Sequence, residues 1–433
     1  MQSDVRTYAF EDCLDALIDY RGKTPRKAAA GIPLVTAKVV KSGRIEAPNE
    51  FISADDFGPW MTRGLPRVGD VVMTTEAPLG EVGQIQCLPV ALAQRIVTLR
   101  GKKGLLDSDY LLYLMQSEPF QAQLRGRASG TTVVGIKQSE LRKVTVELPP
   151  IQEQVQVAST LKSLDDRIDL LRQTNATLEA IAQALFKSWF VDFDPVRAKA
   201  EGREPEGMDA ATAALFPSEF EKSELGLIPK GWRAGTLGDL SELNASKWTT
   251  KQRPDWISYI DLSGVSKNRT APPMEYRFDD APSRARHHLR DGDTIIGTVR
   301  PGNRAFAFIS EPASTLTGST GFAVLSPKSP DLSSFVYLAA TRDEAIERLA
   351  NLADGGAYPA VRPSIVAATP CVGPQPGVRK AFSEIAQPLL NRIARNESNA
   401  RTLSEIRDTL LPRLISGNLR LPEAKKSIEE VVA

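Results

Sequence analysis

The sequence is poor in the residues that build disulfide frameworks and metal sites. Its 433 residues include three cysteines, Cys13, Cys87 and Cys371, and two histidines. The cysteines are odd in number and far apart, so they predict neither a disulfide framework nor a zinc site. Apolar runs of roughly 18 residues, the length of a membrane span, are missing, as is the apolar core of a secretory signal. We therefore expect a cytoplasmic protein without metal or other cofactors.

A large excess of positive charge, which many nucleic-acid-binding proteins carry, is also lacking. Lys and Arg number 54 and Asp and Glu 53, giving a net charge of +1. Taken alone, this balance argues mildly against a nucleic-acid partner. However, a basic groove can be offset by acidic surface elsewhere. The hydrophobic fraction of 42% is enough for the cores of two to four folding units at roughly 100–200 residues each.

Motifs of common catalytic sites are missing too. The sequence contains no phosphate-binding loop and no Gly-x-Gly-x-x-Gly turn. Asp-Phe-Asp-Pro at 192–195 is only faintly similar to the Asp-Pro-Pro-aromatic corner of amino-methyltransferases, because the second proline and the aromatic residue are absent. His287 and His288 supply too few ligands for a metal ion, and we interpret them as surface or groove residues. The chain is therefore predicted to be non-catalytic.

What the sequence does contain is an internal repeat at a nearly constant offset. Gly-Asp-Val-Val at 69–72 matches Gly-Asp-Thr-Ile at 292–295, Gly130 matches Gly355, and Pro149 matches Pro374. Each half reads as short strands, then a short helix, a Gly-rich loop and a long helix. The short helices are expected at 110–123 and about 334–351. Gly69-Asp70 and Gly292-Asp293 are interpreted as structural turns before apolar strands.

The long helices carry the sharpest pattern. Apolar residues and one asparagine step by three and four along a heptad seam, at Leu164, Ile168, Leu171, Asn175, Leu178, Ala182, Leu185 and Trp189. The equivalent positions of the second half repeat the register more weakly. One helix over 151–190 would span ~60 Å, too long to bury its stripe in a small domain. We therefore expect the two helices to pair antiparallel; two separate amphipathic core helices are the alternative. Pro388 predicts a start of the regular second helix near that residue, or a kink there.

Four segments together resemble one known family. They are Leu-Pro-Pro-Ile-Gln-Glu-Gln at 148–154, Leu-Phe-Lys-Ser-Trp-Phe-Val-Asp-Phe at 185–193, Gly-Leu-Ile-Pro-Lys-Gly-Trp at 226–232 and Leu-Leu-Pro-Arg-Leu-Ile-Ser-Gly at 410–417. They resemble the specificity subunits of type I restriction–modification enzymes. The chain departs from that family at 374–379, where Pro-Gln-Pro-Gly-Val-Arg replaces a Pro-x-x-Gln-Glu-Gln start.

The resemblance implies an α+β fold with two target-recognition domains and two long antiparallel helices, related by a pseudo-two-fold internal repeat. Each domain would read one half of a bipartite, asymmetric DNA site, and the helices would set the spacer. The implied partners are double-stranded DNA, two DNA-adenine methyltransferase (modification) subunits and restriction/translocase subunits. We expect recognition domain 1 at 1–150, a central spacer helix at 151–190, a connector at 191–224, recognition domain 2 at 225–375, a distal spacer helix at 376–418 and a C-terminal tail at 419–433.

Candidate DNA contacts are the polar and basic residues of loops between the predicted strands. Forked donors such as Arg, Asn and Gln read base edges, while Lys, Ser, Thr and backbone N–H groups bind phosphates. In domain 1 the candidates are Arg21, Lys23, Thr24, Arg26, Lys27, Gln94, Arg95, Thr131 and Thr132. In domain 2 they are Lys247, Thr249, Lys251, Arg253, Arg284, Arg286, Arg300, Ser319, Thr320 and Tyr358.

Two other functions stay open on the sequence alone. One is a coiled-coil scaffold that assembles partner proteins without reading DNA. The other is a methyltransferase with fused recognition domains, which the missing cofactor and catalytic motifs disfavour.

Overall fold

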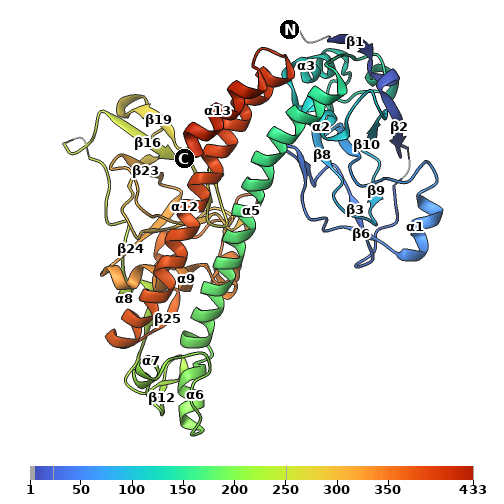
Figure 1. Ribbon diagram of the computed structural model, residues 1–433. Helices are drawn as coiled ribbons and strands as arrows, with labels where there is room; N and C mark the ends of the chain where they lie inside the picture. The colour runs from blue at the N-terminus through green and yellow to red at the C-terminus, as the bar shows by residue number, and fades with distance from the viewer. Residues whose placement is uncertain (1–4, 23, 250, 433) are drawn as a thin grey trace. The chain divides into compact units, whose positions relative to one another are not determined.

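The computed structural model describes residues 5–22, 24–249 and 251–432 (Figure 1). The chain divides into two compact units. Unit 1 consists of the residues up to Ile168 and those from Thr402 onward, and unit 2 is Asp169–Arg401. Two long helices, α5 (Ile151–Phe190) and α12 (Pro376–Ile415), contribute a part to each unit.

Unit 1 is built on two sheets. The first is antiparallel with strand order β2-β10-β7-β8, and β7 is buried along its whole length, as a continuous apolar run predicts. The second has order β6-β3-β9, with β3 and β9 parallel. The strands are β2 (Leu14–Asp19), β3 (Ile32–Val35), β6 (Phe51–Ile52), β7 (Val71–Thr75), β8 (Leu79–Gln84), β9 (Ala91–Leu92) and β10 (Ile96–Gly101).

Helices and small strand pairs complete unit 1. β1 pairs with β11 and β4 with β5, and α13 closes the described chain. These elements are β1 (Arg6–Ala9), β4 (Val40–Lys41), β5 (Arg44–Ile45), α1 (Ala54–Trp60), α2 (Ser108–Gln116), α3 (Glu118–Arg127), α4 (Gln138–Leu141), β11 (Thr145–Leu148) and α13 (Leu421–Val432).

Unit 2 repeats this topology in the second half of the chain. Its sheets have orders β15-β24-β21-β22 and β19-β16-β23-β20, and β16 and β23 are parallel like β3 and β9. The predicted internal repeat is thereby confirmed. The strands are β14 (Arg233–Thr236), β15 (Ser241–Leu243), β16 (Trp256–Ile260), β17 (Val265–Ser266), β18 (Arg269–Thr270), β19 (Met274–Arg277), β20 (Ala285–His288), β21 (Thr294–Gly297), β22 (Phe306–Phe308), β23 (Leu316–Ser319), β24 (Phe322–Pro327) and β25 (Pro370–Gly373).

The remaining elements of unit 2 are short. A connecting region after α5 holds two small helices and a hairpin. Three further helices follow β24. The elements are α6 (Asp194–Ala200), α7 (Ala210–Ala214), β12 (Phe220–Ser223), β13 (Gly226–Pro229), α8 (Leu237–Leu240), α9 (Ser333–Thr341), α10 (Asp343–Asn351) and α11 (Pro363–Ala367).

The short helix predicted in each half is wrong in one respect, because each is two helices. α2 and α3 are separated at Ser117, and α9 and α10 at Arg342, the equivalent position of the second copy. Both separating residues have extended backbone, with ψ of 145° and 152°. In unit 1 Pro119 lies in the first turn of α3, just after the break, where a proline without an N–H is tolerated. Unit 2 has no proline at this position. The apolar periodicity continues across Arg342, so it predicts one helix where packing produces two.

In unit 2, α5 and α12 pack antiparallel. The side-chain amide of Asn396 donates to Asn175 Oδ1 at 2.9 Å, and the rings of Phe186 and Phe382 lie 6.0 Å apart. Contacts that move forward along α5 therefore move backward along α12. In unit 1, Arg407 of α12 donates to Asp165 of α5 at 2.7 Å. Asp165 also accepts a hydrogen bond from Tyr113 Oη of α2 at 2.8 Å, which ties the helix pair to the recognition fold.

The prediction that the second helix starts near Pro388 is wrong. α12 begins at Pro376 and passes through Pro388. Val378, Phe382 and Ala386, all before the proline, are fully buried. Burial of a large apolar side chain contributes about 1.5–3 kcal/mol, so this first stretch offsets the ~3 kcal/mol that an interior proline costs.

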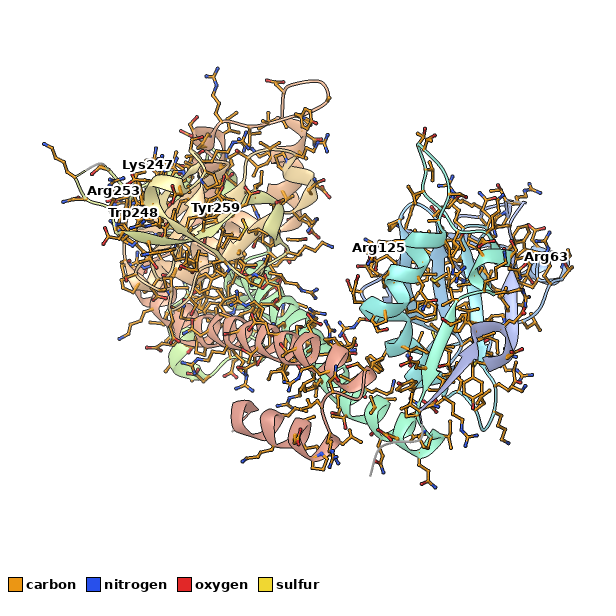
Figure 2. All side chains as sticks on the ribbon, turned by 90° about the horizontal axis from the view of Figure 1, so that it is seen from above. Arg63, Arg125, Lys247, Trp248, Arg253 and Tyr259 are labelled. Carbon is orange, nitrogen blue, oxygen red and sulfur yellow. The ribbon has the colours of Figure 1, made fainter. Side chains whose placement is uncertain are left out.

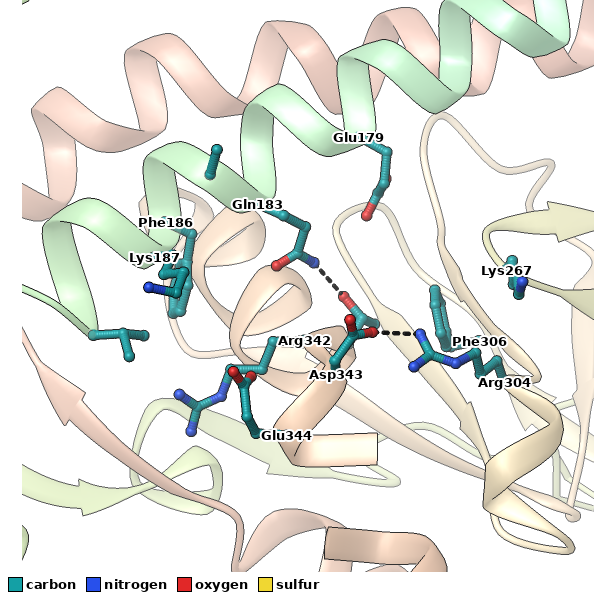
Figure 3. Close-up of a pocket in the computed structure, with 13 residues that line it drawn as sticks. Glu179, Gln183, Phe186, Lys187, Lys267, Arg304, Phe306, Arg342, Asp343 and Glu344 are labelled. Carbon is teal, nitrogen blue, oxygen red and sulfur yellow. Dashed lines mark hydrogen bonds and ion pairs between the residues drawn. The ribbon is translucent and has the colours of Figure 1, made fainter. Parts of the chain in front are cut away.

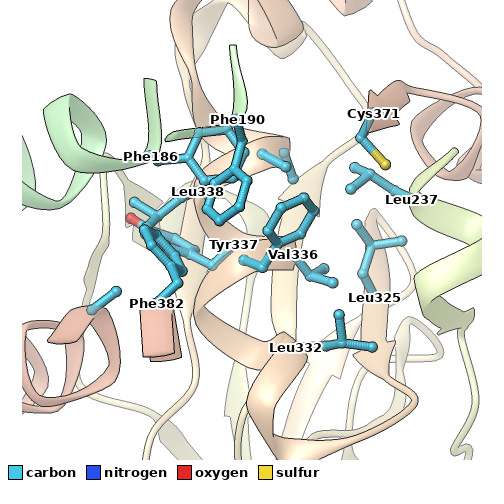
Figure 4. Packing of buried hydrophobic residues seen from close by; sticks show 14 of the residues in the cluster. Phe186, Phe190, Leu237, Leu325, Leu332, Val336, Tyr337, Leu338, Cys371 and Phe382 are labelled. Atoms are coloured by element: carbon cyan, nitrogen blue, oxygen red, sulfur yellow. The ribbon is translucent and has the colours of Figure 1, made fainter. Parts of the chain in front are cut away.

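Aromatic residues are scarce in the sequence but gather in the core of unit 2. Phe186 and Phe190 of α5 pack on Phe382 of α12 and Phe335 of α9, with ring centres 4.8–6.0 Å apart (Figure 4). Trp189 packs on Phe382 as well. The segment 185–193 is thus a core segment, which joins the helix pair to the sheet and helices of unit 2.

Candidate nucleic-acid interface

The loops that follow the central strands of unit 1 come together at Thr75. Its N–H donates to the carbonyl of Arg95 at 3.0 Å, and its own carbonyl accepts from Ile136 N at 3.0 Å. The loop after β7, the turn before β10 and the loop before α4 therefore adjoin. Two of the three predicted contact regions of unit 1, Gln94–Arg95 and Thr131–Thr132, therefore lie at this edge, beside the loop after β7.

The third region, around Arg21, joins the same edge. The Arg21 guanidinium pairs with Asp19 at 2.7 Å and donates to the Ile136 carbonyl at 2.8 Å. Thr24 Oγ1 donates to Gln94 Oε1 at 2.9 Å. Arg21 is thus occupied in holding the loops together, whereas Thr24 is exposed. The sequence alone could not distinguish the anchoring Arg21 from the exposed Thr24.

The remaining basic candidates of unit 1 lie in different settings. Arg95 is exposed and its Nε lies 3.1 Å from Glu76 Oε1, a surface ion pair of the kind that contributes little to stability. Arg26 is exposed. Lys27 pairs with Glu50 at 2.8 Å. Lys23 lies outside the described residues.

Thr131 and Thr132 are exposed in a loop whose ends are joined by reciprocal backbone hydrogen bonds. Ser129 N donates to Gly135 O at 2.8 Å, and Gly135 N donates to Ser129 O at 3.0 Å. Gly130 has φ of +116°, and a Cβ there would lie 2.1 Å from the Val133 carbonyl oxygen, so the turn requires glycine. We call residues 129–135 the unit 1 tip loop.

The same edge in unit 2 is built from equivalent contacts. Thr298 N donates to Gly321 O at 2.9 Å, and the Thr298 carbonyl accepts from Val361 N at 2.9 Å. Residues 354–360, here called the unit 2 tip loop, are closed between Asp354 and Ala360 at 3.1 and 2.8 Å. This loop carries Tyr358, and Arg300 lies beside it. The guanidinium of Arg300 lies 4.8 Å from the centre of the Tyr358 ring.

Three more candidates lie next to this edge of unit 2. Thr320 is exposed, and its N–H donates to the carbonyl of Arg284 at 2.8 Å. Arg284 is exposed too. Ser319 is 1% exposed and its hydroxyl accepts from Gly321 N at 3.2 Å. Ser319 therefore shapes the turn, and Thr320 is the residue of the pair that faces solvent.

The other basic candidates of unit 2 form a second group, next to β20. Figure 2 shows Lys247 and Arg253 close to Trp248. The guanidinium groups of Arg253 and Arg286 lie 5.0 and 5.2 Å from the Phe278 ring centre. Arg253 also pairs with Asp279. Thr249 and Lys251 are exposed in the same segment, while Thr250 lies outside the described residues.

Sequence reasoning missed residues whose partners are distant in the chain. The indole N–H of Trp248 donates to Thr317 Oγ1 at 2.8 Å, and its ring stacks on His288 at 4.2 Å. The sequence signal for Trp248 was its position as an aromatic residue between Lys247 and Lys251. Arg63 donates to the carbonyls of Asp19 and Arg21, both at 2.9 Å, and no local pattern marks it.

The interpretation of the two histidines as surface or groove residues is wrong for His287, which is 2% exposed. Burial, together with the nearby Lys247, lowers the pKa of His287 to about 4. The ring is therefore neutral near pH 7 and supplies no charge to a DNA surface. Within the described ranges, no three His, Cys, Asp or Glu side chains cluster closely enough to hold a metal ion. In the same part of the chain, no helix combines the length and apolarity that crossing a membrane requires.

A cavity of about 470 Å³ lies elsewhere in unit 2, between α5 and the break that separates α9 from α10 (Figure 3). Arg304 pairs with Asp343 at 2.6 Å, and Gln183 donates to Thr341 Oγ1 at 3.0 Å. Glu179 accepts from Tyr337 Oη at 2.9 Å, and burial raises the pKa of Glu179 above its usual range. These groups are satisfied by one another, so this wall of the cavity attaches α5 to the recognition fold of unit 2.

Comparison with known proteins adds to this geometry. The family model described as a type I restriction modification DNA specificity domain matches residues 26–180. The chain is 25% identical over 360 residues to the MjaIX specificity subunit of Methanocaldococcus jannaschii, covering 82% of this chain and 78% of that protein. It is also 25% identical over 328 residues to the HindI specificity subunit of Haemophilus influenzae, covering 64% and 69%.

A solved structure supports the fold. The S subunit of a type I restriction–modification system from M. genitalium superposes with a TM-score of 0.57 at 15% identity, covering 95% of this chain and 96% of that one. The family model covers one copy of the repeat, and the topology of unit 2 supplies the second copy. Over most of its length the chain is similar to the specificity subunits of type I restriction–modification enzymes.

Proposed function

We propose that this chain reads a bipartite, asymmetric DNA sequence, with the recognition fold of each unit reading one half. As a specificity subunit, the chain is the non-catalytic recognition component of its complex. The observation that carries the proposal is a pair of equivalent edges with different side chains. Ala77 and Arg300 occupy the same positive-φ position after the central strand, with φ of 49° and 47°. Two readers of one fold and different chemistry suit two different half-sites.

Further equivalent positions differ in the same way. The backbone N–H of Thr75 donates to the carbonyl of Arg95, and the equivalent N–H of Thr298 donates to the carbonyl of Gly321. The same turn position therefore holds an arginine in unit 1 and a glycine in unit 2. Val133 of the unit 1 tip loop stands where the unit 2 tip loop has Tyr358. Unit 1 thus offers an arginine in the turn, and unit 2 offers an arginine and a tyrosine at the tip loop. The candidates that we propose as DNA contacts are exposed, except for the half-buried Gln94 and Arg286; they are Thr24, Arg26, Gln94, Arg95, Thr131, Thr132, Lys247, Thr249, Lys251, Arg284, Arg286, Arg300, Thr320 and Tyr358.

We further propose that the chain works in the cytoplasm with two methyltransferase subunits and, in the restricting complex, translocase subunits. Exposed apolar side chains on α5 support a helical docking surface. In unit 2, Leu170 and Ile181 are 53% and 50% exposed, and their separation along the chain corresponds to about three helical turns, so both lie on one face. In unit 1, Val155 of the same helix is 47% exposed.

A domain exchange tests the two-reader proposal. Residues 1–150 are replaced by the recognition domain of another specificity subunit, and methylation is mapped across the host genome. One half of the methylated sequence should change while the other stays the same. The matched exchange of residues 225–375 should change the opposite half. If both halves changed in either exchange, or neither did, the assignment of one half-site to each unit would fail. Methylation that remains without sequence preference would favour a scaffold.

A further inference from the structure

The two tip loops, 129–135 in unit 1 and 354–360 in unit 2, are built alike but carry different side chains. Both are closed by two backbone hydrogen bonds between their first and last residues, at 2.8–3.1 Å. Both contain a positive-φ glycine as the second residue, Gly130 and Gly355. The residue after each loop attaches it to the central strand by a backbone hydrogen bond. Ile136 N donates to the carbonyl of Thr75 in unit 1, and Val361 N donates to the carbonyl of Thr298 in unit 2. The loops are therefore rigidly mounted extensions of the two reading edges.

The ends of both loops expose apolar surface to solvent. Val133 and Val134 are each 51% exposed, and Tyr358 is 73% exposed. A single exposed apolar residue carries little information, because folded proteins expose many. Here, however, the exposed residues occur at the equivalent place in both units, beside exposed polar residues such as Thr131 and Thr132. The pattern is an apolar tip next to groups that can bind phosphate.

Tyr358 is held in its exposed position. Arg300 N donates to the carbonyl of Pro359 at 2.7 Å, and the Arg300 guanidinium donates to the carbonyl of Ala357 at 2.7 Å. The guanidinium lies over one face of the Tyr358 ring at 4.8 Å. Because the side chain remains 73% exposed, ring surface is left for a second flat partner. A preorganised ring loses little conformational entropy when it stacks.

We propose that the two tips act as wedges, with Val133–Val134 of unit 1 and Tyr358 of unit 2 each inserting between stacked bases of the half-site that its own unit binds. This inference rests on the proposed function and extends it from contact to DNA deformation. Apolar side chains placed between base steps unstack and bend DNA, and the bend is repaid by additional contacts. The tyrosine ring can stack on a base whichever base it is. The wedges would therefore add affinity and select deformable steps instead of reading base edges.

The test uses the full chain co-expressed with its modification subunits and a duplex carrying the methylated sequence mapped in the host. 2-Aminopurine, which brightens when unstacked, replaces one adenine at a time in each half-site. Wild-type protein should brighten at least one position in each half. Tyr358→Ala should abolish the signal in the half read by unit 2 only, and weaken binding roughly five- to 150-fold. Tyr358→Phe keeps the ring and should behave like wild type. The double variant Val133→Ser with Val134→Ser should abolish the 2-aminopurine signal only in the half-site read by unit 1.

The outcomes separate the two proposals. If wild-type protein bound the mapped duplex no better than a scrambled duplex, the proposed function itself would fail. Specific binding without any 2-aminopurine signal, or with Tyr358→Ala unchanged from wild type, would overturn the wedges alone. A third result would also overturn the wedges. If replacing thymine by uracil weakened binding of wild-type protein but not of Tyr358→Ala, and the 2-aminopurine fluorescence did not change, the tip would be reading thymine methyl groups. Circular dichroism of each variant checks that the fold is intact.

Discussion

At the scale of single residues, Asp70 and Asp293 show how one position can diverge between the two units. Both precede a buried strand and both accept a backbone hydrogen bond from three residues earlier, at 2.8 and 2.7 Å. Asp70 also pairs with Arg100 at 2.7 Å. In unit 2 the strand equivalent of Arg100 is Ser326, so Asp293 lacks this cation. Burial then raises the pKa of Asp293 to about 6.

Asp293→Asn should therefore stabilise unit 2 at neutral pH. A carboxyl whose folded pKa is raised from 3.8 to about 6 binds its proton more tightly when folded, so its contribution favours folding at low pH. That contribution is lost as the pH rises from about 4 through about 6. By calorimetry, the asparagine variant should exceed the wild-type unfolding temperature at pH 7.5, and the difference should shrink as the pH is lowered towards 3.8.

The matched control is Asp70→Asn, which leaves Arg100 without its carboxylate. It should lower stability at pH 7.5 by about 1–3 kcal/mol, the cost of an unpaired, largely buried charged group. Opposite signs for the two variants are the expected result. If Asp293→Asn were destabilising at pH 7.5, the prediction would be wrong. The charged carboxylate would then be stabilised by more than its hydrogen bond from Arg290 N.

At the scale of elements, the helix pair of unit 2 depends on an aromatic core. Phe382 is fully buried between Phe186, Trp189 and Phe190 of α5. Phe382→Ala should cost about 3–5 kcal/mol of unfolding free energy, because it removes a large buried side chain and leaves a cavity. Ile385→Ala, on the same helix but at a side chain that is 45% exposed, should cost far less. Urea denaturation of the full chain compares them, and equal losses would contradict this packing.

A second element-scale prediction concerns the buried amide pair. Asn396 is 2% exposed and donates to Asn175, whose own amide donates to the carbonyl of Ile393 at 3.2 Å. Asn396→Leu alone should destabilise by about 1–3 kcal/mol, because it removes the donor to Asn175. Asn175→Leu with Asn396→Leu should recover most of that loss, as apolar pairs do in heptad seams. A thermal double-mutant cycle measures the coupling, and additive effects would mean that the two amides act independently.

Elements with strong local patterns could be predicted from the sequence, and those set by distant packing could not. The heptad seam, the antiparallel pairing of the long helices and the internal repeat all follow from periodicity and spacing. The breaks at Ser117 and Arg342 and the passage of α12 through Pro388 depend on neighbours far along the chain. For the candidate site, loop sequence located Arg21 and Ser319 but could not show that hydrogen bonds and burial already engage them.

At the scale of the whole molecule, the net charge of +1 fits recognition that is divided between two small reading edges. Cations such as Arg95 and Arg253 are partly offset by Glu76 and Asp279. On the proposed function, such a protein gains little from long-range attraction to DNA in general, so discrimination would come from local contacts on each edge, both from exposed donors and from the tips.

The last prediction tests the helix pair as the spacer between the two half-sites. One heptad is inserted into α5 near Asn175 and a second into α12 near Asn396, so that the paired seam stays in register. Each insertion lengthens its helix by about 10 Å at roughly 1.5 Å per residue. Since the reading edges are untouched, methylation mapping should return the same two half-sites with a longer spacer. A single insertion in α5 alone is the control, and it should impair methylation because it misaligns the seam. An unchanged spacer in the double insertion would mean that the helices do not set the distance between the half-sites.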